Sequence, residues 1–294
     1  MMTRPINKFS HPIRRAKTAI GDNQISYLYI DQNFDNPIIF LHGIPSSAEL
    51  WREIMVLTSK DNFGVYAPDL AGYGKTRLPK DGDYSLAGSA ELIAEWIKKK
   101  FGKAVWIVGH DIGGAVAQIL AVTNPELVKR LTLCNSPMAS SFPVLPVKIF
   151  KALAKLGLYT PIAKAGLVPN PYTISKMKAG FFDSDILSKE KIKQIFWSEK
   201  LYNEEGRRQF SRHLKALNNK KSCQVADSFS NLSIPVQLIW AKNDHYQPWQ
   251  KVGTKLEKAI PNTTTFLIEQ AGHYLPIEKP AEFANALVRW HDSI

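Results

Sequence analysis

The sequence is poor in cysteine and has no long apolar segment. Its 294 residues include only Cys134 and Cys223, which lack the spacing of a metal-binding or redox motif, so we expect two free thiols. No apolar run approaches the ~20 residues that cross a bilayer, and the polar, basic residues 1–17 lack the apolar centre of a secretory signal. We therefore expect a cytoplasmic protein with no stable membrane insertion.

Acidic residues are also scarce. The chain has 26 Asp and Glu against 38 Lys and Arg, a net charge of +12. Most of this excess falls in residues 137–222, where 13 Lys and 3 Arg stand against 2 Asp and 4 Glu, a net charge of +10. No nucleic-acid-binding motif accompanies these lysines, so we expect a solvated basic face and no nucleic-acid partner. Weak attraction of anionic substrates or lipid surfaces stays open.

Apolar, β-branched runs alternate with helix-like segments along most of the chain. The runs with strand character are residues 25–30, 37–41, 64–67, 104–108, 131–133, 236–240 and 264–268. Helical patterns cover residues 89–100, 113–123, 250–259 and 281–290. Continuous apolar strands separated by helices predict an α/β fold in which helices cover both faces of a mostly parallel sheet.

The alternation is interrupted once, by about a hundred residues of basic, helix-like sequence with several prolines. We expect residues 1–136 and 223–294 to form the core domain. Residues 137–222 are expected to form a helical subdomain inserted into it.

The segment Gly109-His-Asp-Ile-Gly-Gly114 connects a predicted strand to a predicted helix. A sharp strand-to-helix turn pushes its central side chain out of the sheet edge. Bulky residues beside that side chain would clash, so the turn needs small residues around its centre. Such a turn normally carries a serine, but here the central residue is Asp111. An aspartate at a helix N-terminus can also be a capping residue, so the turn alone leaves both roles open.

Two later segments place an acid and a histidine directly after consecutive predicted strands. Asp244 follows the strand at 236–240, and His273 follows the strand at 264–268. Because the ends of parallel strands meet at one edge of a sheet, the side chains of Asp111, Asp244 and His273 can meet there. Asp227 is a weaker alternative for the acid.

An earlier turn, Phe40-Leu-His-Gly-Ile-Pro45, ends another predicted strand. It places the backbone N–H of Ile44 near Asp111, where it can pair with the N–H of Ile112 to stabilise an oxyanion. We expect His42 to hold this turn by packing and hydrogen bonding.

Together these motifs resemble the α/β-hydrolase superfamily, within the branch of epoxide hydrolases and haloalkane or haloacid dehalogenases. The resemblance rests on the His-Gly-x-Pro turn, on residues 68–74 (PDLAGYG), on the GHDIGG turn, and on the segments around Asp244 and His273. It implies an α/β-hydrolase fold with a mostly parallel central sheet and a helical cap, residues 137–222, inserted after the sixth strand.

An aspartate nucleophile suits a substrate whose reacting carbon is saturated. A serine would form an ether, which water cannot readily open, whereas a carboxylate forms an ester whose carbonyl water can attack. We therefore expect Asp111 to displace an epoxide oxygen or a halide. His273 is the expected general base and Asp244 the residue that orients it. The N–H groups of Ile44 and Ile112 are the expected oxyanion hole.

The leaving group separates the two chemistries. The resemblance implies that cap tyrosines bind the alkoxide formed by epoxide opening; the insertion offers Tyr159, Tyr172 and Tyr202, of which Tyr172 and Tyr202 are our candidates. Haloalkane dehalogenases instead carry a tryptophan after the nucleophile and often a polar residue in the His-Gly-x-Pro turn. This chain has Ile112 and Ile44 there, and neither side chain can donate a hydrogen bond, which counts against a haloalkane dehalogenase. Epoxide hydrolases also commonly carry a tryptophan after the nucleophile, although some resemble the HDIG sequence of this chain, so we expect an epoxide hydrolase first and a dehalogenase second.

Two other functions stay open, an ester or lactone hydrolase with an atypical nucleophile and a non-catalytic ligand-binding protein on the same scaffold. We expect a small, apolar substrate, no cofactor or metal, and a monomer or homodimer. The apolar residues of the insertion that could line the pocket are Phe142, Val144, Leu145, Phe181, Phe182, Phe196 and Trp197.

Overall fold

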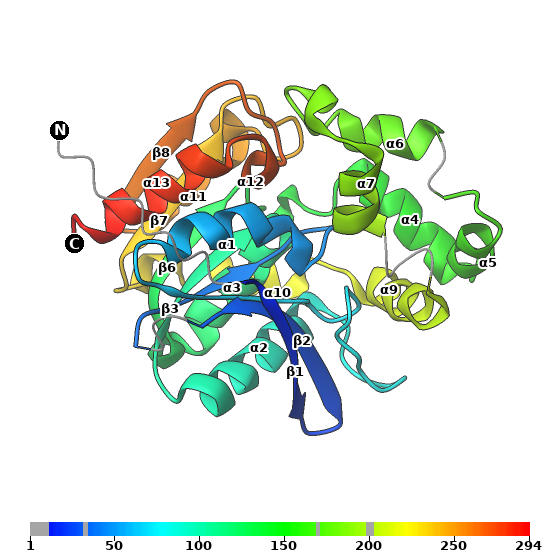
Figure 1. Cartoon of the computed structure of the whole chain (residues 1–294), viewed down its shortest axis with the longest axis horizontal. Coiled ribbons are helices and arrows are strands. Elements are labelled where there is room, and N and C mark those ends of the chain that lie inside the picture. The colour runs from blue at the N-terminus through cyan, green and yellow to red at the C-terminus, as the bar shows by residue number, and fades with distance from the viewer. Residues whose placement is uncertain (1–11, 32–34, 169–170, 198–202) are drawn as a thin grey trace.

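The computed structural model describes residues 12–31, 35–168, 171–197 and 203–294. Within them, eight strands form one central sheet (Figure 1). The strands are β1 (Arg14–Ile20), β2 (Asn23–Ile30), β3 (Pro37–Leu41), β4 (Gly64–Pro68), β5 (Val105–His110), β6 (Val128–Cys134), β7 (Val236–Ala241) and β8 (Thr263–Ile268). Their order across the sheet is β1-β2-β4-β3-β5-β6-β7-β8. Only the pairs β1–β2 and β2–β4 are antiparallel, so the predicted mostly parallel α/β sheet is confirmed.

Helices cover both faces of this sheet. On one face α1 (Arg52–Ser59) packs beside α13 (Pro280–His291), and on the other α2 (Leu86–Phe101) packs beside α3 (Ile112–Thr123). The remaining helices are α4 (Leu145–Lys155), α5 (Tyr159–Lys164), α6 (Pro171–Lys178), α7 (Lys189–Ile192), α9 (Glu204–Ala216), α10 (Lys220–Ala226), α11 (Thr254–Ala259) and α12 (Leu275–Glu278).

The inner strands are largely buried. Every residue of β3, β5 and β7 is buried, which explains their continuous apolar sequences. Their carboxyl ends lie along one edge of the sheet, and the turns that follow them carry the candidate site.

The sequence did not predict β1 or α1. β1 lies at the edge of the sheet, where its side chains are exposed or half-buried, so its sequence RRAKTAI lacks the apolar continuity of the inner strands. α1 has only eight residues, too few for a clear helical period.

The segment between β6 and β7 contains helices α4 to α10. Figure 1 shows α4, α5, α6, α7 and α9 gathered to one side of the sheet. The predicted boundary between residues 222 and 223 falls inside α10, which packs against α3. Cys134, which is buried in β6, and Cys223 are both free thiols, as predicted. Within the described residues, no helix has the length and apolar character needed to cross a membrane.

Candidate active site

Asp111 occupies the turn between β5 and α3 with φ 51° and ψ −128°, a conformation that a non-glycine residue rarely adopts. The turn requires glycine around it. A Cβ on Gly113 would lie 2.3 Å from the carbonyl oxygen of Leu41, and one on Gly43 would lie 2.5 Å from the Cβ of Asp111. The strained turn therefore pushes the carboxylate out of the sheet edge, against the loop that follows β3.

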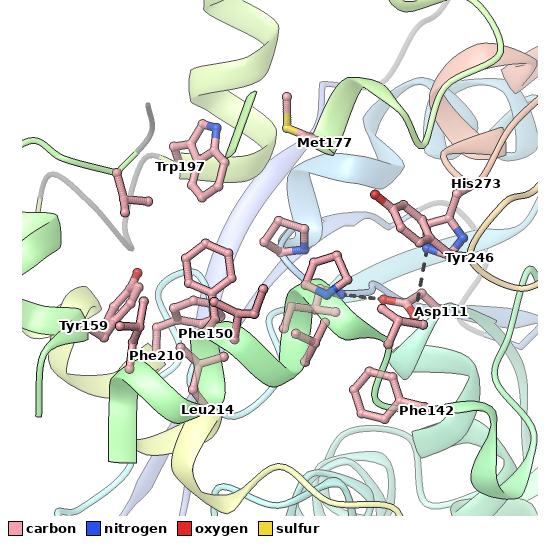
Figure 2. Close-up of a pocket in the computed structure, with 18 of the residues that line it drawn as sticks. Asp111, Phe142, Phe150, Tyr159, Met177, Trp197, Phe210, Leu214, Tyr246 and His273 are labelled. Atoms are coloured by element: carbon pink, nitrogen blue, oxygen red, sulfur yellow. Dashed lines mark hydrogen bonds and ion pairs between the residues drawn. The ribbon is translucent and has the colours of Figure 1, made fainter. Parts of the chain in front are cut away.

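The two carboxylate oxygens of Asp111 have different surroundings. Oδ2 accepts a hydrogen bond of 2.9 Å from the backbone N–H of Ile44. Oδ1 faces Nε2 of His273 at 3.9 Å, which is too long for a hydrogen bond (Figure 2). Burial raises the pKa of Asp111 to about 6, against the opposing effects of His273 and of the N–H groups of Ile44 and Ile112. The backbone thus fixes Oδ2, while Oδ1 makes no hydrogen bond to His273.

His273 is oriented by Asp244. Its Nδ1 donates a hydrogen bond of 2.9 Å to Oδ2 of Asp244, so in the neutral imidazole the lone pair lies on Nε2, toward Asp111. Burial acts to lower the pKa of His273, but the negative charge of Asp244 and its hydrogen bond raise the pKa above its ordinary value. The three side chains that the sequence predicted to meet lie together.

Asp244 is held in turn by its own loop. Its Oδ1 accepts hydrogen bonds from the backbone N–H groups of Tyr246, at 2.7 Å, and Gln247, at 3.0 Å. Burial would raise the pKa of Asp244, but the charge of His273 and these hydrogen bonds keep it below its ordinary value. This acid therefore stays ionised while it orients the histidine.

Asn135 and His110 position the histidine loop, and sequence reasoning missed both. Asn135 donates to the carbonyl oxygens of Gly272 and His273 and accepts from the N–H of Ala241, which ties the end of β7 to this loop. Nε2 of His110 lies 2.8 Å from the carbonyl oxygen of His273 and donates to it, and burial lowers its pKa to about 3. The available signal was a polar residue directly after β6, the same pattern that identified Asp244 and His273.

The insertion contacts the histidine loop directly. The N–H of His273 donates to the carbonyl oxygen of Gly180 at 2.6 Å, just after α6. The carboxylate of Glu278 accepts from the N–H groups of Gly272 and Phe182, both at 2.8 Å, and so bridges the two segments. The position of His273 therefore depends on the insertion as well as on the sheet.

A cavity of about 490 Å³ lies between this site and the insertion (Figure 2). Its wall is largely apolar, and it includes Phe142, Val144 and Trp197 of the seven predicted lining residues. The other four have different surroundings: Leu145 and Phe182 are exposed, while Phe181 and Phe196 are buried and pack against Tyr274.

Within the described residues, two tyrosines that the sequence did not single out lie beside His273. The rings of Tyr246 and Tyr274 lie 5.2 and 5.3 Å from its ring and also line the cavity. Burial raises the pKa of both phenols, so they are protonated at neutral pH. Tyr202 and the side chain of Tyr172 lie outside the described residues.

Trp197 and Tyr159 lie at the end of the cavity away from Asp111 (Figure 2). The indole N–H of Trp197 is buried and has no hydrogen-bond partner within the described residues. Nowhere among the described residues do three His, Cys, Asp or Glu side chains group as they would around a metal ion.

We expect Asp111→Asn to be more stable than the wild type at high pH. The folded pKa of about 6 exceeds the ordinary value of 3.8, so the folded state binds the proton more tightly and ionisation of Asp111 costs stability as pH rises. The shift corresponds to on the order of 2–3 kcal/mol. The free energy of unfolding of the variant in urea should therefore exceed that of the wild type by more at pH 8 than at pH 4. A difference that does not change with pH would contradict the raised pKa of Asp111.

The chain is similar to known proteins in sequence and in structure. Residues 36–280 match the family described as alpha/beta hydrolase fold. The chain is 24% identical over 274 residues to the uncharacterized hydrolase YugF of Bacillus subtilis, covering 92% of this chain and 94% of that protein. It is also 24% identical over 294 residues to bifunctional epoxide hydrolase 2 of Sus scrofa, covering 89% of this chain and 52% of that protein. An alpha/beta hydrolase fold protein from Burkholderia ambifaria has a similar structure, with a TM-score of 0.81 at 20% identity over 93% of this chain and 97% of that one.

Proposed function

Since the chain belongs to the alpha/beta hydrolase fold family, we propose that it hydrolyses small apolar substrates through an ester on Asp111, and that its substrates are epoxides. The observation that carries this proposal is the Asp111 carboxylate itself. It stands at the nucleophile turn with Oδ2 on the N–H of Ile44 and Oδ1 toward His273. A cap aspartate would instead accept a hydrogen bond from the N–H of Gly113 or Gly114, the second and third residues of α3, and no such cap bond is present.

In the first step, Oδ1 of Asp111 attacks a saturated ring carbon of the epoxide from behind. The C–O bond of the ring breaks, the new C–O ester bond forms, and the released alkoxide takes a proton. The phenols of Tyr246 and Tyr274 are protonated and line the cavity beside His273, so they join Tyr172 and Tyr202 as candidate proton donors.

In the second step, Nε2 of His273 takes a proton from water, and the hydroxide attacks Cγ of Asp111. Negative charge develops on Oδ2, which the N–H groups of Ile44 and Ile112 stabilise. The alkyl–oxygen group then leaves Cγ with the proton from His273, which releases the diol and leaves Asp111 as the acid. The second proton of the water passes from Asp111 to the tyrosinate that protonated the alkoxide, which restores the carboxylate and the phenol. Ester formation also removes the charge of Asp111, one of the groups that raise the pKa of His273, and so favours the neutral base.

Dehalogenation by the same nucleophile is the second candidate. A halide needs hydrogen-bond donors where it leaves, near the carbon that Asp111 attacks. The side chains of Ile44 and Ile112 offer none, and Trp197 with its unpartnered N–H lies at the other end of the cavity from Asp111 (Figure 2). The lack of such donors on Ile44 and Ile112 therefore favours an epoxide over a haloalkane.

We propose that residues 137–222 act as a cap that excludes water and selects the substrate. The cavity lies between the sheet edge and this segment, and its apolar wall suits an apolar substrate.

A substrate panel tests the proposal. Purified protein is incubated with aryl and alkyl epoxides, 1-bromoalkanes and p-nitrophenyl esters, and diol, bromide and p-nitrophenol are measured. We expect diol formation. Bromide release without diol formation would mean that the substrate is a haloalkane. No turnover of any substrate, together with stabilisation of the protein by a ligand, would favour a binding protein. An ester hydrolase would show p-nitrophenol release that Asp111→Ser increases.

We expect kcat/KM for the epoxide to fall as pH drops through about 6. Asp111 attacks only as the carboxylate, and burial raises its pKa to about 6, so protonation removes the nucleophile as the pH falls through this value. A pH–rate profile from pH 4.5 to 9 measures this limb. A rate that stays constant from pH 7 down to pH 4.5 would contradict the assigned protonation states.

A further inference from the structure

The outward face of α4 carries large apolar side chains. Leu145 and Leu156 are 70% and 72% exposed, and Ile149 between them is also exposed. Leu156 directly follows α4 with helical backbone, so spacings of four and seven residues place the three on one face. Leu158, which follows α4, and Leu167, which follows α5, are exposed as well. We call Leu145, Ile149, Leu156, Leu158 and Leu167 the outer patch.

Such a concentration is unusual for a surface that only contacts water. Among the described residues, nine large apolar side chains are exposed, and seven of them belong to residues 145–186. In Figure 1, α4 and α5 lie at the end of the molecule farthest from β8 and α11, so this surface projects away from the core.

Lysines accompany the outer patch, and acids are missing. From residue 137 to residue 182 the sequence has six lysines and no Asp or Glu. Lys148, Lys155 and Lys164 are exposed on the same two helices. An apolar helix face bordered by lysines is the pattern of helices that lie in the interface of a bilayer with anionic lipids.

The outer patch also adjoins the entrance to the cavity. Ile149 and Leu167 line the cavity and are exposed at the same time, so they lie at its opening. A surface that covered the outer patch would therefore face the opening, and an apolar molecule dissolved in a lipid layer could enter the cavity without crossing water.

We infer that the outer patch docks on the surface of an anionic phospholipid bilayer, with the cavity entrance toward the lipid. Charge selects this partner over a second copy of the chain, because a symmetric contact would bring two sets of these lysines together with no acid between residues 137 and 182 to pair with them. The inference does not depend on which bond the enzyme hydrolyses.

Vesicle flotation tests the inference. The whole protein is mixed with vesicles of phosphatidylcholine alone or with 30% phosphatidylglycerol, at low and high salt. We expect binding to the anionic vesicles that weakens with salt, and at least tenfold weaker binding for the double variant Leu145→Ser, Leu156→Ser. Neither side chain lines the cavity, so hydrolysis of a water-soluble substrate should stay unchanged.

Matched controls come from the opposite side of the molecule. Leu267→Ser removes an exposed leucine from β8, and Lys255→Ser with Lys258→Ser removes two exposed lysines from α11. We expect both controls to bind as the wild type does, and Lys148→Ser with Lys155→Ser to lose the preference for anionic vesicles.

Three results would overturn the inference. The wild type could fail to bind anionic vesicles, or the Leu145→Ser, Leu156→Ser variant could bind as well as the wild type. Alternatively, sedimentation could show a dimer that this variant abolishes, which would mean that a second copy covers the outer patch. Loss of the proposed activity in all proteins, with vesicle binding intact, would reject the proposed function alone.

Discussion

Asp111→Asn is expected to reduce turnover by at least about a thousandfold while the protein folds as the wild type does. Asparagine has the shape of aspartate, and its amide oxygen can accept the hydrogen bond from Ile44, but the amide is not a nucleophile toward a saturated carbon. Losing the nucleophile removes the whole ester pathway, which is why this effect should be among the largest. Steady-state kinetics measures it, and intact mass verifies that the amide has not reverted to the acid.

The matched control is Asp227→Asn, which changes an exposed acid that the sequence left as a weaker candidate. Asp227 follows α10, whereas Asp244 is the acid bonded to His273. We expect the control to retain full activity. Turnover of Asp111→Asn within tenfold of the wild type would rule out an aspartyl ester as the main route.

His273→Gln is expected to stop the reaction after its first step. Asp111 can still attack the substrate, but no group remains to take the proton from water, so the ester accumulates. Intact-protein mass spectrometry should show one adduct per chain, with the mass of the whole epoxide because ring opening releases no fragment. A haloalkane would instead add an alkyl group without its halogen.

Steady-state turnover of this variant should fall by about a thousandfold or more, while the burst of ester formation stays within about tenfold of the wild type. His245→Gln is the matched control, since His245 is exposed and lies beside Asp244. An adduct on a residue other than Asp111, or normal turnover without His273, would contradict the assigned roles.

The sequence predicted the parts of the site that depend on the order of strands. Asp111, Asp244 and His273 each lie in the turn or loop that follows a strand, and the carboxyl ends of parallel strands lie at one edge of the sheet. His42 was predicted to hold its turn, and its Nε2 accepts a hydrogen bond from the N–H of Leu70 at 3.0 Å. Local patterns and one rule of topology were enough for these residues.

The sequence could not predict contacts that depend on how the insertion folds back over the core. The bond from His273 to Gly180 joins residues 93 positions apart, and no periodicity or motif encodes it. The approach of Phe182 to Glu278 has the same origin. The sequence assigned no role to Tyr246, because its role depends on the position of its ring against His273, which only the folded chain defines.

A single turnover in H₂¹⁸O tests the central claim most directly. With enzyme in excess over epoxide, water attacks Cγ of Asp111, so the new oxygen of the diol comes from the carboxylate and the label enters the protein. We expect an unlabelled diol and a peptide containing Asp111 that is heavier by about 2 Da, the mass difference between the two oxygen isotopes. A labelled diol with an Asp111 peptide of unchanged mass would mean that water attacks the substrate itself, and the aspartyl-ester account would be wrong.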